Sequence, residues 1–269
     1  MRFATLLLCA IILAAPPATA QSSLTLSADP VPIVEAEING RQVRLEVDLR
    51  LPDVIVLNPD VARRLGVRCV PLLAAGVGLD DALIRGRIAR PRIVFAGAGS
   101  TRAMTGIFSV PASHRADGLI GPGALPYDIV RIELRPALEG DREMSFVLVD
   151  ADIWEPTISV GILDVEVSFD LANASSTFNR TAAVLLDDAG AIVPDGAHSE
   201  TSMLLGLRAQ TQPVRTELTV AGLGLGPVVA RTRSPLVGAT DEETIVVRAE
   251  ADAPQPTLWV GREALARCS

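Results

Sequence analysis

The sequence predicts a mainly β protein made of two pseudo-symmetric lobes with short helices. Strand-like alternation of apolar and polar residues runs up to Asp48 and again up to Asp170, and each run is followed by Leu and then a helix-like segment. The separation from Asp48 to Gly97 is 49 residues, and that from Asp170 to Gly222 is 52. An internal duplication is the economical explanation for this agreement.

The first twenty residues have the features of a secretory signal peptide. Arg2 supplies the charged start, residues 6–14 the apolar core, and 18–20 a small-residue cleavage site. We therefore expect an exported chain that begins at Gln21 and is located in the periplasm or outside the cell. No other stretch approaches the roughly 20 apolar residues of a membrane-spanning helix, so we expect no membrane span.

The charge of the exported chain is negative. The only charged residue lost with the signal peptide is Arg2, which leaves 23 basic residues against 32 acidic ones and a net charge of −9. This balance argues against nucleic acid and anionic lipid as partners. The remaining 249 residues are enough for an N-terminal lobe over residues 21–140 and a C-terminal lobe over residues 141–269.

Cys69 and Cys268 are the two cysteines of the exported chain. An oxidising compartment permits a bridge between them, which would tie the first lobe to the end of the chain. Two unpaired thiols are the alternative, because spacing alone does not show whether the residues meet.

A hairpin begins the repeated pattern. Residues 31–38 and 41–47 are strand-like and flank Asn39-Gly40, the strongest short hairpin signal. A strand over 51–57 and a helix over 58–66 follow. Further strands are expected in the first half at 24–27, 82–87, 92–97 and 104–110, and in the second half at 204–210, 217–222 and 228–232. Each half then has an apolar-apolar-Gly element, at 117–121 and 258–261, and helical pieces are expected at 122–125, 181–186 and 262–267. Two strands between the halves, at 130–134 and 144–149, could form a sheet shared by both.

This order of hairpin, Asp, strand, helix and a final apolar-apolar-Gly element, present twice, resembles the aspartic peptidase superfamily of pepsin-like and retropepsin-like proteins. The resemblance covers nearly all of the exported chain. It implies two β-rich lobes facing each other across a substrate cleft, with Asp48 and Asp170 matching the two catalytic aspartates. It implies no cofactor and no metal.

The sequence departs from the family's Asp-Thr/Ser-Gly motif at both aspartates. The motifs are Asp48-Leu49-Arg50 and Asp170-Leu171-Ala172, so both hydroxyls and both glycines are replaced. Exchanging both partners of a buried hydrogen bond for apolar groups can be nearly neutral for stability. Catalysis is affected more than stability, because Arg50 favours the charged form of Asp48 and can take the place of the attacking water.

These departures predict a protein that has lost efficient catalysis and binds a peptide or protein in the cleft between the lobes. An active endopeptidase that uses Asp48 and Asp170 is one alternative, and a structural envelope protein is another. Asp48 and Asp170 can also be ordinary turn residues at strand ends. His114 and His198 stand alone without ligands at metal-binding spacing, so we expect no zinc site. The sequence does not indicate an oligomeric state.

Overall fold

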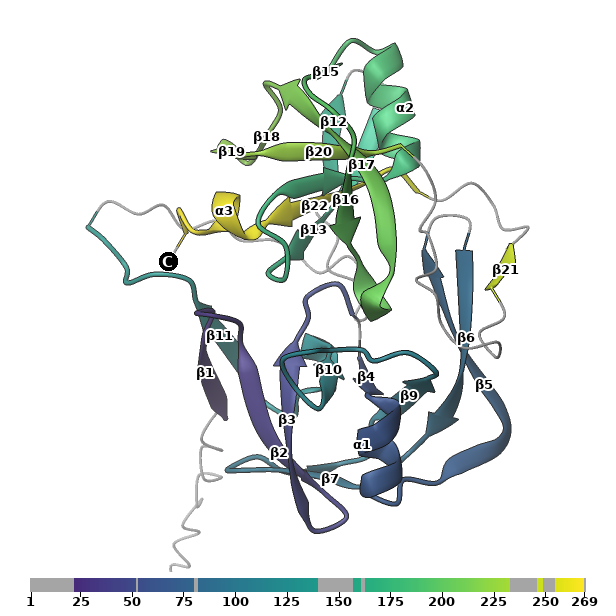
Figure 1. Cartoon of the computed structure of the whole chain (residues 1–269). Coiled ribbons are helices and arrows are strands. Elements are labelled where there is room, and N and C mark those ends of the chain that lie inside the picture. Colours follow the sequence, from purple (N-terminus) through teal and green to yellow (C-terminus); the bar gives the residue numbers. More distant parts are fainter. Residues whose placement is uncertain are drawn as a thin grey trace, which may run out of the picture.

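The structure is a computed structural model, and its described residues are 22–51, 53–79, 82–139, 157–160, 163–232, 246–248 and 255–268. The expected signal peptide and the expected strand over 144–149 lie outside these residues, as does the expected boundary between the lobes at 140. The protein is mainly β, as predicted, with short helices (Figure 1). No helix in the described residues is long and apolar enough to cross a membrane.

The first large sheet is formed mostly by the N-terminal half of the chain and lies in the lower part of Figure 1. Its strands, in spatial order, are β21 (Val246–Arg248), β6 (Ala82–Ala89), β9 (Met104–Phe108), β4 (Val54–Leu57), β10 (Gly118–Ile120), β3 (Arg41–Val47), β2 (Ile33–Ile38), β7 (Ile93–Phe95) and β8 (Gly99–Thr101), with β5 (Cys69–Leu79) paired to β6. β21 comes from the C-terminal half, so this sheet contains strands from both halves of the chain.

The second large sheet lies in the upper part of Figure 1. Its strands, in spatial order, are β12 (Thr157–Val160), β13 (Leu163–Asp170), β22 (Thr257–Gly261), β14 (Ser176–Phe178), β20 (Val228–Arg231), β17 (Arg208–Thr216) and β15 (Ile192–Pro194), with β16 (Ser199–Ser202) paired to β17.

Each of the two sheets contains six central strands, and these strands pair in the same way in both sheets. The order β2-β3-β10-β4-β9-β6 alternates antiparallel and parallel pairs, beginning and ending with an antiparallel pair. The order β12-β13-β22-β14-β20-β17 has the same alternation. The sequence order of these strands within each half is also the same, which is the arrangement that an internal duplication produces.

The helices follow equivalent strands. α1 (Pro59–Arg64) follows β4, and α2 (Arg180–Asp188) follows β14. The 3-10 helix η1 (Pro122–Ala124) follows β10, and α3 (Arg262–Leu265) follows β22. All four lie where the sequence predicts helical segments, with ends shifted by a few residues.

The turn between β2 and β3 confirms the hairpin predicted from Asn39-Gly40. Both residues have positive φ, 52° for Asn39 and 78° for Gly40, as a two-residue hairpin turn requires. The predicted positions Gly97 and Gly222 also lie in tight turns with positive φ, between β7 and β8 and between β18 (Thr219–Val220) and β19 (Leu223–Gly224).

Three expectations need correction. Residues 204–206 form a 3-10 turn, η2 (Leu204–Gly206), so the strand expected over 204–210 begins only at Arg208, in β17. β5 was not predicted as a strand. The strand expected at 130–134 is β11 (Ile129–Glu133), but in the described residues it pairs in parallel with β1 (Ser23–Ser27) instead of joining a sheet shared by both halves.

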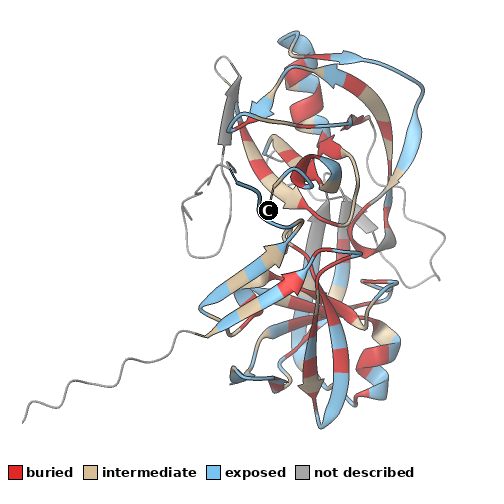
Figure 2. Ribbon diagram, turned by 90° about the vertical axis from the view of Figure 1, so that its left-hand side faces the viewer, coloured by how far each residue is buried: buried red, intermediate tan, exposed pale blue. Residues whose placement is uncertain are grey.

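The buried side chains form three clusters, and buried positions alternate along the strands of both sheets (Figure 2). One cluster packs within the first sheet and one within the second. The third joins residues of the first sheet to the turn η2, which belongs to the second half of the chain. The two halves therefore share part of their core.

The thiols of Cys69 and Cys268 are free, so the predicted bridge is not formed. Cys69 begins β5, whereas Cys268 follows α3, and these elements lie on opposite sides of the molecule (Figure 1). The physical reason is that β5 belongs to the first sheet, whereas α3 follows β22 of the second.

Candidate functional site

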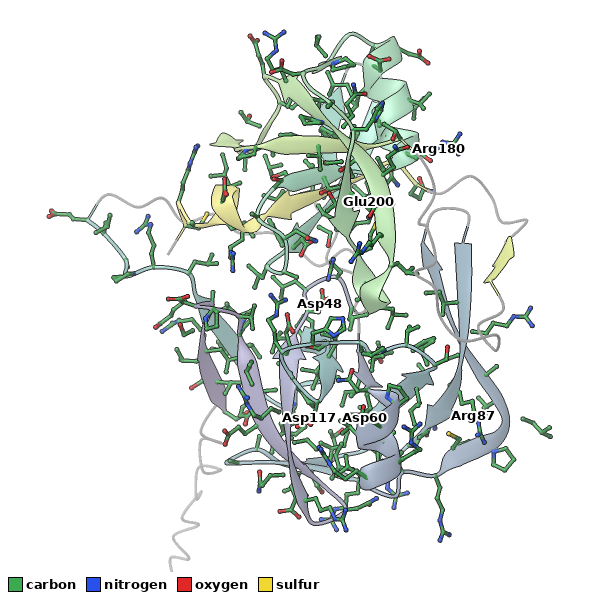
Figure 3. All side chains as sticks on the ribbon, in the orientation of Figure 1. Asp48, Asp60, Arg87, Asp117, Arg180 and Glu200 are labelled. Atoms are coloured by element: carbon green, nitrogen blue, oxygen red, sulfur yellow. The ribbon has the colours of Figure 1, made fainter. Side chains whose placement is uncertain are left out.

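The strand pairing places Asp48 and Asp170 at equivalent positions in the two sheets. Asp48 follows β3, and its amide donates to the carbonyl of Ile120 at the end of β10 (3.0 Å). Asp170 ends β13 and is paired with Gly261 at the end of β22. Both aspartates are buried, with 7% and 3% of their surface exposed, and Asp48 lies between the two sheets (Figure 3).

Gly261 allows the close approach that shapes the turn after Asp170. A Cβ at Gly261 would lie 2.3 Å from the carbonyl carbon of Ser175 and 2.5 Å from the carbonyl oxygen of Ala174. Both contacts are with backbone atoms, which cannot move aside as a flexible side chain can. The glycine of the predicted apolar-apolar-Gly element is therefore required by packing against the loop that carries Asp170.

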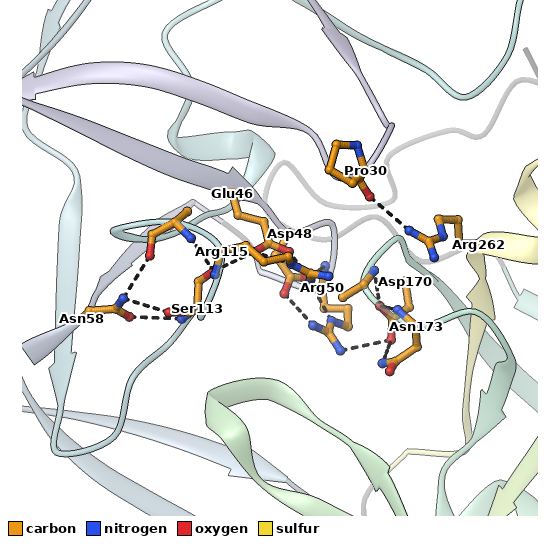
Figure 4. Close-up of polar contacts among 12 residues, drawn as sticks. Pro30, Glu46, Asp48, Arg50, Asn58, Ser113, Arg115, Asp170, Asn173 and Arg262 are labelled. Atoms are coloured by element: carbon orange, nitrogen blue, oxygen red, sulfur yellow. Dashed lines mark hydrogen bonds and ion pairs between the residues drawn. The ribbon is translucent and has the colours of Figure 1, made fainter.

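Arg50 bridges the two aspartates (Figure 4). Its Nε donates to Oδ1 of Asp48 (2.9 Å), its Nη2 to Oδ2 of Asp48 (2.6 Å), and its Nη1 to Oδ2 of Asp170 (3.0 Å). The Arg50 side chain is 14% exposed. The guanidinium thus makes a two-pronged contact with one carboxylate and a single contact with the other.

The backbone turns beside the aspartates supply the remaining donors. Oδ1 of Asp48 also accepts from the amide of Arg50 (3.0 Å). Oδ1 of Asp170 accepts from the amides of Ala172 (2.9 Å) and Asn173 (3.1 Å), while the side chain of Asn173 donates to Oδ2 (2.6 Å). Every carboxylate oxygen of the pair therefore accepts at least one hydrogen bond.

The surroundings of Asp48 favour its ionised form. Burial by itself would raise the pKa of Asp48, but the charge of Arg50 and the hydrogen bonds from its side chain and amide outweigh burial and hold the pKa below its ordinary value. Burial by itself would lower the pKa of Arg50, but the charges of Asp48 and Asp170 raise it above its ordinary value. Asp48 and Arg50 thus form a permanently charged pair at neutral pH.

A second ionic network lies next to this site (Figure 4). Glu46 is 5% exposed and precedes Asp48 by two residues. Its carboxylate accepts from Nη2 of Arg115 (2.6 Å) and from the hydroxyl of Ser113 (2.7 Å). The side chain of Asn58 in turn binds the backbone of Ser113 through both its oxygen and its nitrogen. The loop before β10 is therefore fixed to the strand that carries Asp48.

A small cavity lies on the Asp170 side of the site. It has a volume of about 10 Å³, room for roughly one water molecule. Arg231 is 5% exposed and stacks over the ring of Trp259, with its Cζ 4.0 Å from the ring centre. The lining residues are Arg50, Asp170, Asn173, Thr177, Thr201, Met203, Thr211, Arg231 and Trp259.

Sequence reasoning identified Asp48, Asp170 and the influence of Arg50 on Asp48. It did not identify the contact of Arg50 with Asp170, nor Asn173 as a donor to that carboxylate. The Asp-x-x-Asn spacing of Asp170 and Asn173 is a usable signal, because Asp commonly accepts from backbone and side-chain donors two or three residues ahead. Glu46 carries no comparable signal, since its partner Arg115 is 69 residues away.

Leu49 and Leu171, which directly follow the two aspartates, make apolar contacts. Leu49 packs against the clusters of both sheets, and Leu171 is buried in the cluster of the second sheet. Among the described residues no group of three or more His, Cys, Asp or Glu side chains is placed to hold a metal ion.

A scan against protein-family models gave no match to this chain. A search of curated proteins also gave no match.

Proposed function

We propose that this protein is an exported, two-lobed relative of the aspartic peptidases that no longer hydrolyses peptides and binds a peptide segment between its lobes. One observation carries the proposal: the guanidinium of Arg50 lies between the carboxylates of Asp48 and Asp170 and donates hydrogen bonds to both.

The bridge opposes the chemistry of an aspartic peptidase. In that chemistry two carboxylates share one proton and activate a water molecule between them. Here a permanent cation takes that place, and it favours ionisation of Asp48. Asp48 is then held in its charged form and does not share a proton with its partner, and Arg50 competes with water for the oxygens that would hold it.

Two further features support the family assignment within this proposal. The six-strand cores of the two large sheets share their order and pairing, as expected for duplicated lobes. Asp48 follows β3 and binds the end of β10, which Gly121 follows, while Asp170 ends the equivalent strand β13 and pairs with Gly261 at the end of β22. The binding role comes from the resemblance, which implies a substrate cleft between two lobes.

A peptidase assay tests the loss of catalysis. Residues 21–269 are incubated with a mixed peptide library from pH 3 to pH 7, and products are followed by mass spectrometry. We expect no cleavage that depends on Asp48. The control is Asp48→Asn, which preserves the shape of the side chain. Cleavage by the wild type that disappears in Asp48→Asn contradicts the proposal and favours an active endopeptidase.

A reverted variant tests whether the replaced residues of the two motifs are the cause. Leu49→Thr with Arg50→Gly, combined with Leu171→Thr and Ala172→Gly, restores the family motif at both aspartates. We expect Asp48-dependent cleavage at acidic pH in this variant. Its matched control carries the same four changes together with Asp48→Asn.

A further inference from the structure

One segment of the first half is basic, although the chain as a whole is acidic. Residues 82–116 contain six arginines and no Asp or Glu, whereas the chain has a formal net charge of −8. Arg115 pairs with Glu46 beside the candidate site. In the part of the chain that the structure describes, no ion pair includes the other five, which are Arg85, Arg87, Arg90, Arg92 and Arg102. These five cations are exposed and therefore accessible to an anionic ligand.

Most of this basic segment is one long hairpin that changes direction in the middle. β6 pairs with β9, and β7 pairs with β8. Three residues on each side, 90–92 and 102–104, lie between the two ladders, so the register does not change. The two parts join different strands of the first sheet, because β9 pairs with β4 whereas β7 pairs with β2, and Figure 1 shows β6 and β7 running in different directions. Arg90 and Arg102 both lie where the hairpin changes direction.

A cavity of about 370 Å³ lies at this place, and it is hereafter the arginine cavity. Its lining consists of Asp53, Arg90 and residues 101–104 and 123–126. Its volume is within the range of roughly 300–1,000 Å³ that is typical of sites for small ligands. None of its lining residues borders the small cavity beside Asp170. The arginine cavity is therefore a second place on the molecule where a ligand can be held.

Three charged side chains line the arginine cavity: Arg90, Arg102 and Asp53. All three are exposed, and within the described residues none of them forms an ion pair or a side-chain hydrogen bond. Their charges add up to +1, so a single carboxylate would neutralise them. A phosphate monoester carries about two negative charges at pH 7 and would leave an excess of negative charge beside Asp53. The charges therefore favour a ligand with one carboxylate, which a guanidinium can bind through two parallel hydrogen bonds.

The floor of the arginine cavity is apolar. Ala124 and Leu125 are 7% and 6% exposed, whereas Met104 is 38% exposed and leaves apolar surface uncovered. Asp53 lies directly beside this floor, because a Cβ at Gly123 would be only 3.2 Å from the Cβ of Asp53. A ligand that covers the floor with an aliphatic group can therefore donate an N–H group to Asp53. The C-terminal residue of a peptide carries a carboxylate, a side chain and an N–H group on adjacent atoms.

We infer that the arginine cavity binds the C-terminal residue of a peptide with an aliphatic side chain. The carboxylate accepts hydrogen bonds from Arg90 and Arg102, and the side chain lies on Met104 and Leu125. The N–H group of the same residue donates to Asp53. An internal peptide segment has no free carboxylate, so the site distinguishes the end of a chain from its middle. This inference does not depend on the binding proposed between the lobes.

A matched pair of small peptides tests the role of the carboxylate. The probe is acetyl-Ala-Leu with a free carboxylate, and its control is the same peptide with a C-terminal amide. Each is titrated into ¹⁵N-labelled residues 21–269, and the amide resonances are followed by NMR. We expect the acid to shift the resonances of residues 101–104 and 123–125 and to bind at least tenfold more tightly than the amide, which cannot form charge-assisted hydrogen bonds as an acceptor for both arginines. Equal affinity of the acid and the amide overturns the inference, as does tighter binding of inorganic phosphate at the same residues.

Three arginine variants separate a specific site from general attraction to a basic surface. Arg90→Gln and Arg102→Gln should each weaken binding of the acid at least tenfold. Arg92→Gln is the matched control, because Arg92 is exposed and belongs to the same segment but does not line the cavity. It should change the affinity less than twofold. Equal losses in all three variants overturn the inference. Since all three side chains are exposed, we expect the variants to fold, and their NMR spectra without peptide verify this.

The positions of the shifted resonances distinguish this inference from the proposed function. Shifts confined to residues around Asp48 and Asp170 would place the peptide between the lobes. That result overturns the inference and leaves the proposed function standing. Shifts at residues 101–104 and 123–125 support the inference whatever the outcome of the peptidase assay, so a failure of either idea is recognised by its own measurement.

Discussion

Replacement of Arg50 by Met removes the bridge and leaves two buried carboxylates without it. The side chain of Arg50 provides three hydrogen bonds, two to Asp48 and one to Asp170. Asp48 would keep the amide of Arg50 as a donor, and Asp170 would keep its three donors from Ala172 and Asn173. Asp48 therefore loses most of its stabilisation, whereas Asp170 loses less.

The expected loss in the free energy of unfolding at pH 7 is about 3 kcal/mol. Removing one partner of a buried ion pair costs roughly 3–5 kcal/mol, and the donors that remain on Asp170 favour the lower end of that range. With an m-value of about 3 kcal/mol/M, the midpoint of urea unfolding should fall by about 1 M.

The pH dependence gives the sharper test. In the wild type the pKa of Asp48 is lowered, so its contribution to stability is present above the ordinary value of 3.8 and is lost as the pH falls through the lowered folded value. In Arg50→Met, burial without a cation should raise the pKa of Asp48 above that of the unfolded chain. The variant should therefore regain stability as the pH falls from 7 toward about 5, while the wild type does not.

Urea unfolding of both proteins at pH 7 and pH 5, followed by circular dichroism, measures this difference. The triple variant Asp48→Asn, Arg50→Met, Asp170→Asn is the control, and it should show no gain in stability between the two pH values. A loss below about 1 kcal/mol at pH 7 that is the same at pH 5 would refute the reasoning, because it would mean that the carboxylates do not depend on Arg50.

Three other substitutions have expected effects on the free energy of unfolding, each measured by urea denaturation at pH 7. Gly261→Ala should cost at least about 2 kcal/mol, because the new Cβ would overlap backbone atoms of Ser175 and Ala174. Gly224→Ala is the control and should cost little, since its Cβ would approach only the far end of the Arg267 side chain. Asn179→Ala should cost about 1–2 kcal/mol, because the side chain caps α2 by accepting from the amide of its third residue (2.8 Å); no measurable loss would show that this cap is dispensable. Glu46→Ala should cost about 1–2 kcal/mol, because it leaves the buried hydroxyl of Ser113 without its acceptor, while the side chain of Arg115 is 45% exposed and can turn to water. Glu200→Ala, which breaks an exposed pair at 3.4 Å, should cost less than about 0.5 kcal/mol, and equal losses would contradict this ranking.

Local patterns predicted much of the strand and helix arrangement. Alternation of apolar residues located β3 at residues 41–47, and Asn39-Gly40 located its turn. β5 escaped prediction because its sequence contains Pro71 and two glycines, and because a bulge between Cys69 and Ala74 interrupts the alternation. Proline, glycine and broken alternation occur in turns as well as in irregular strands. Whether such a segment becomes a strand therefore depends on the strand available to pair with it.

The candidate site was predictable only in part, because its decisive contact is long-range. The effect of Arg50 on Asp48 follows from a spacing of two residues. Its contact with Asp170 spans 120 residues and depends on how the two sheets meet. The buried turn at Leu204–Gly206 was missed for a related reason, since its apolar residues pack against a different sheet and follow no strand or helix period.

The pairing of β21 with β6 has a consequence for how the chain acquires its structure. β21 lies in sequence between β20 and β22 of the second sheet, yet it completes the edge of the first. In a chain that ends before residue 246, residues 82–84 of β6 would keep their pairing with β5 and lose β21 on their other side. The edge of the first sheet is therefore completed only after residues some 160 positions later in the chain have been made.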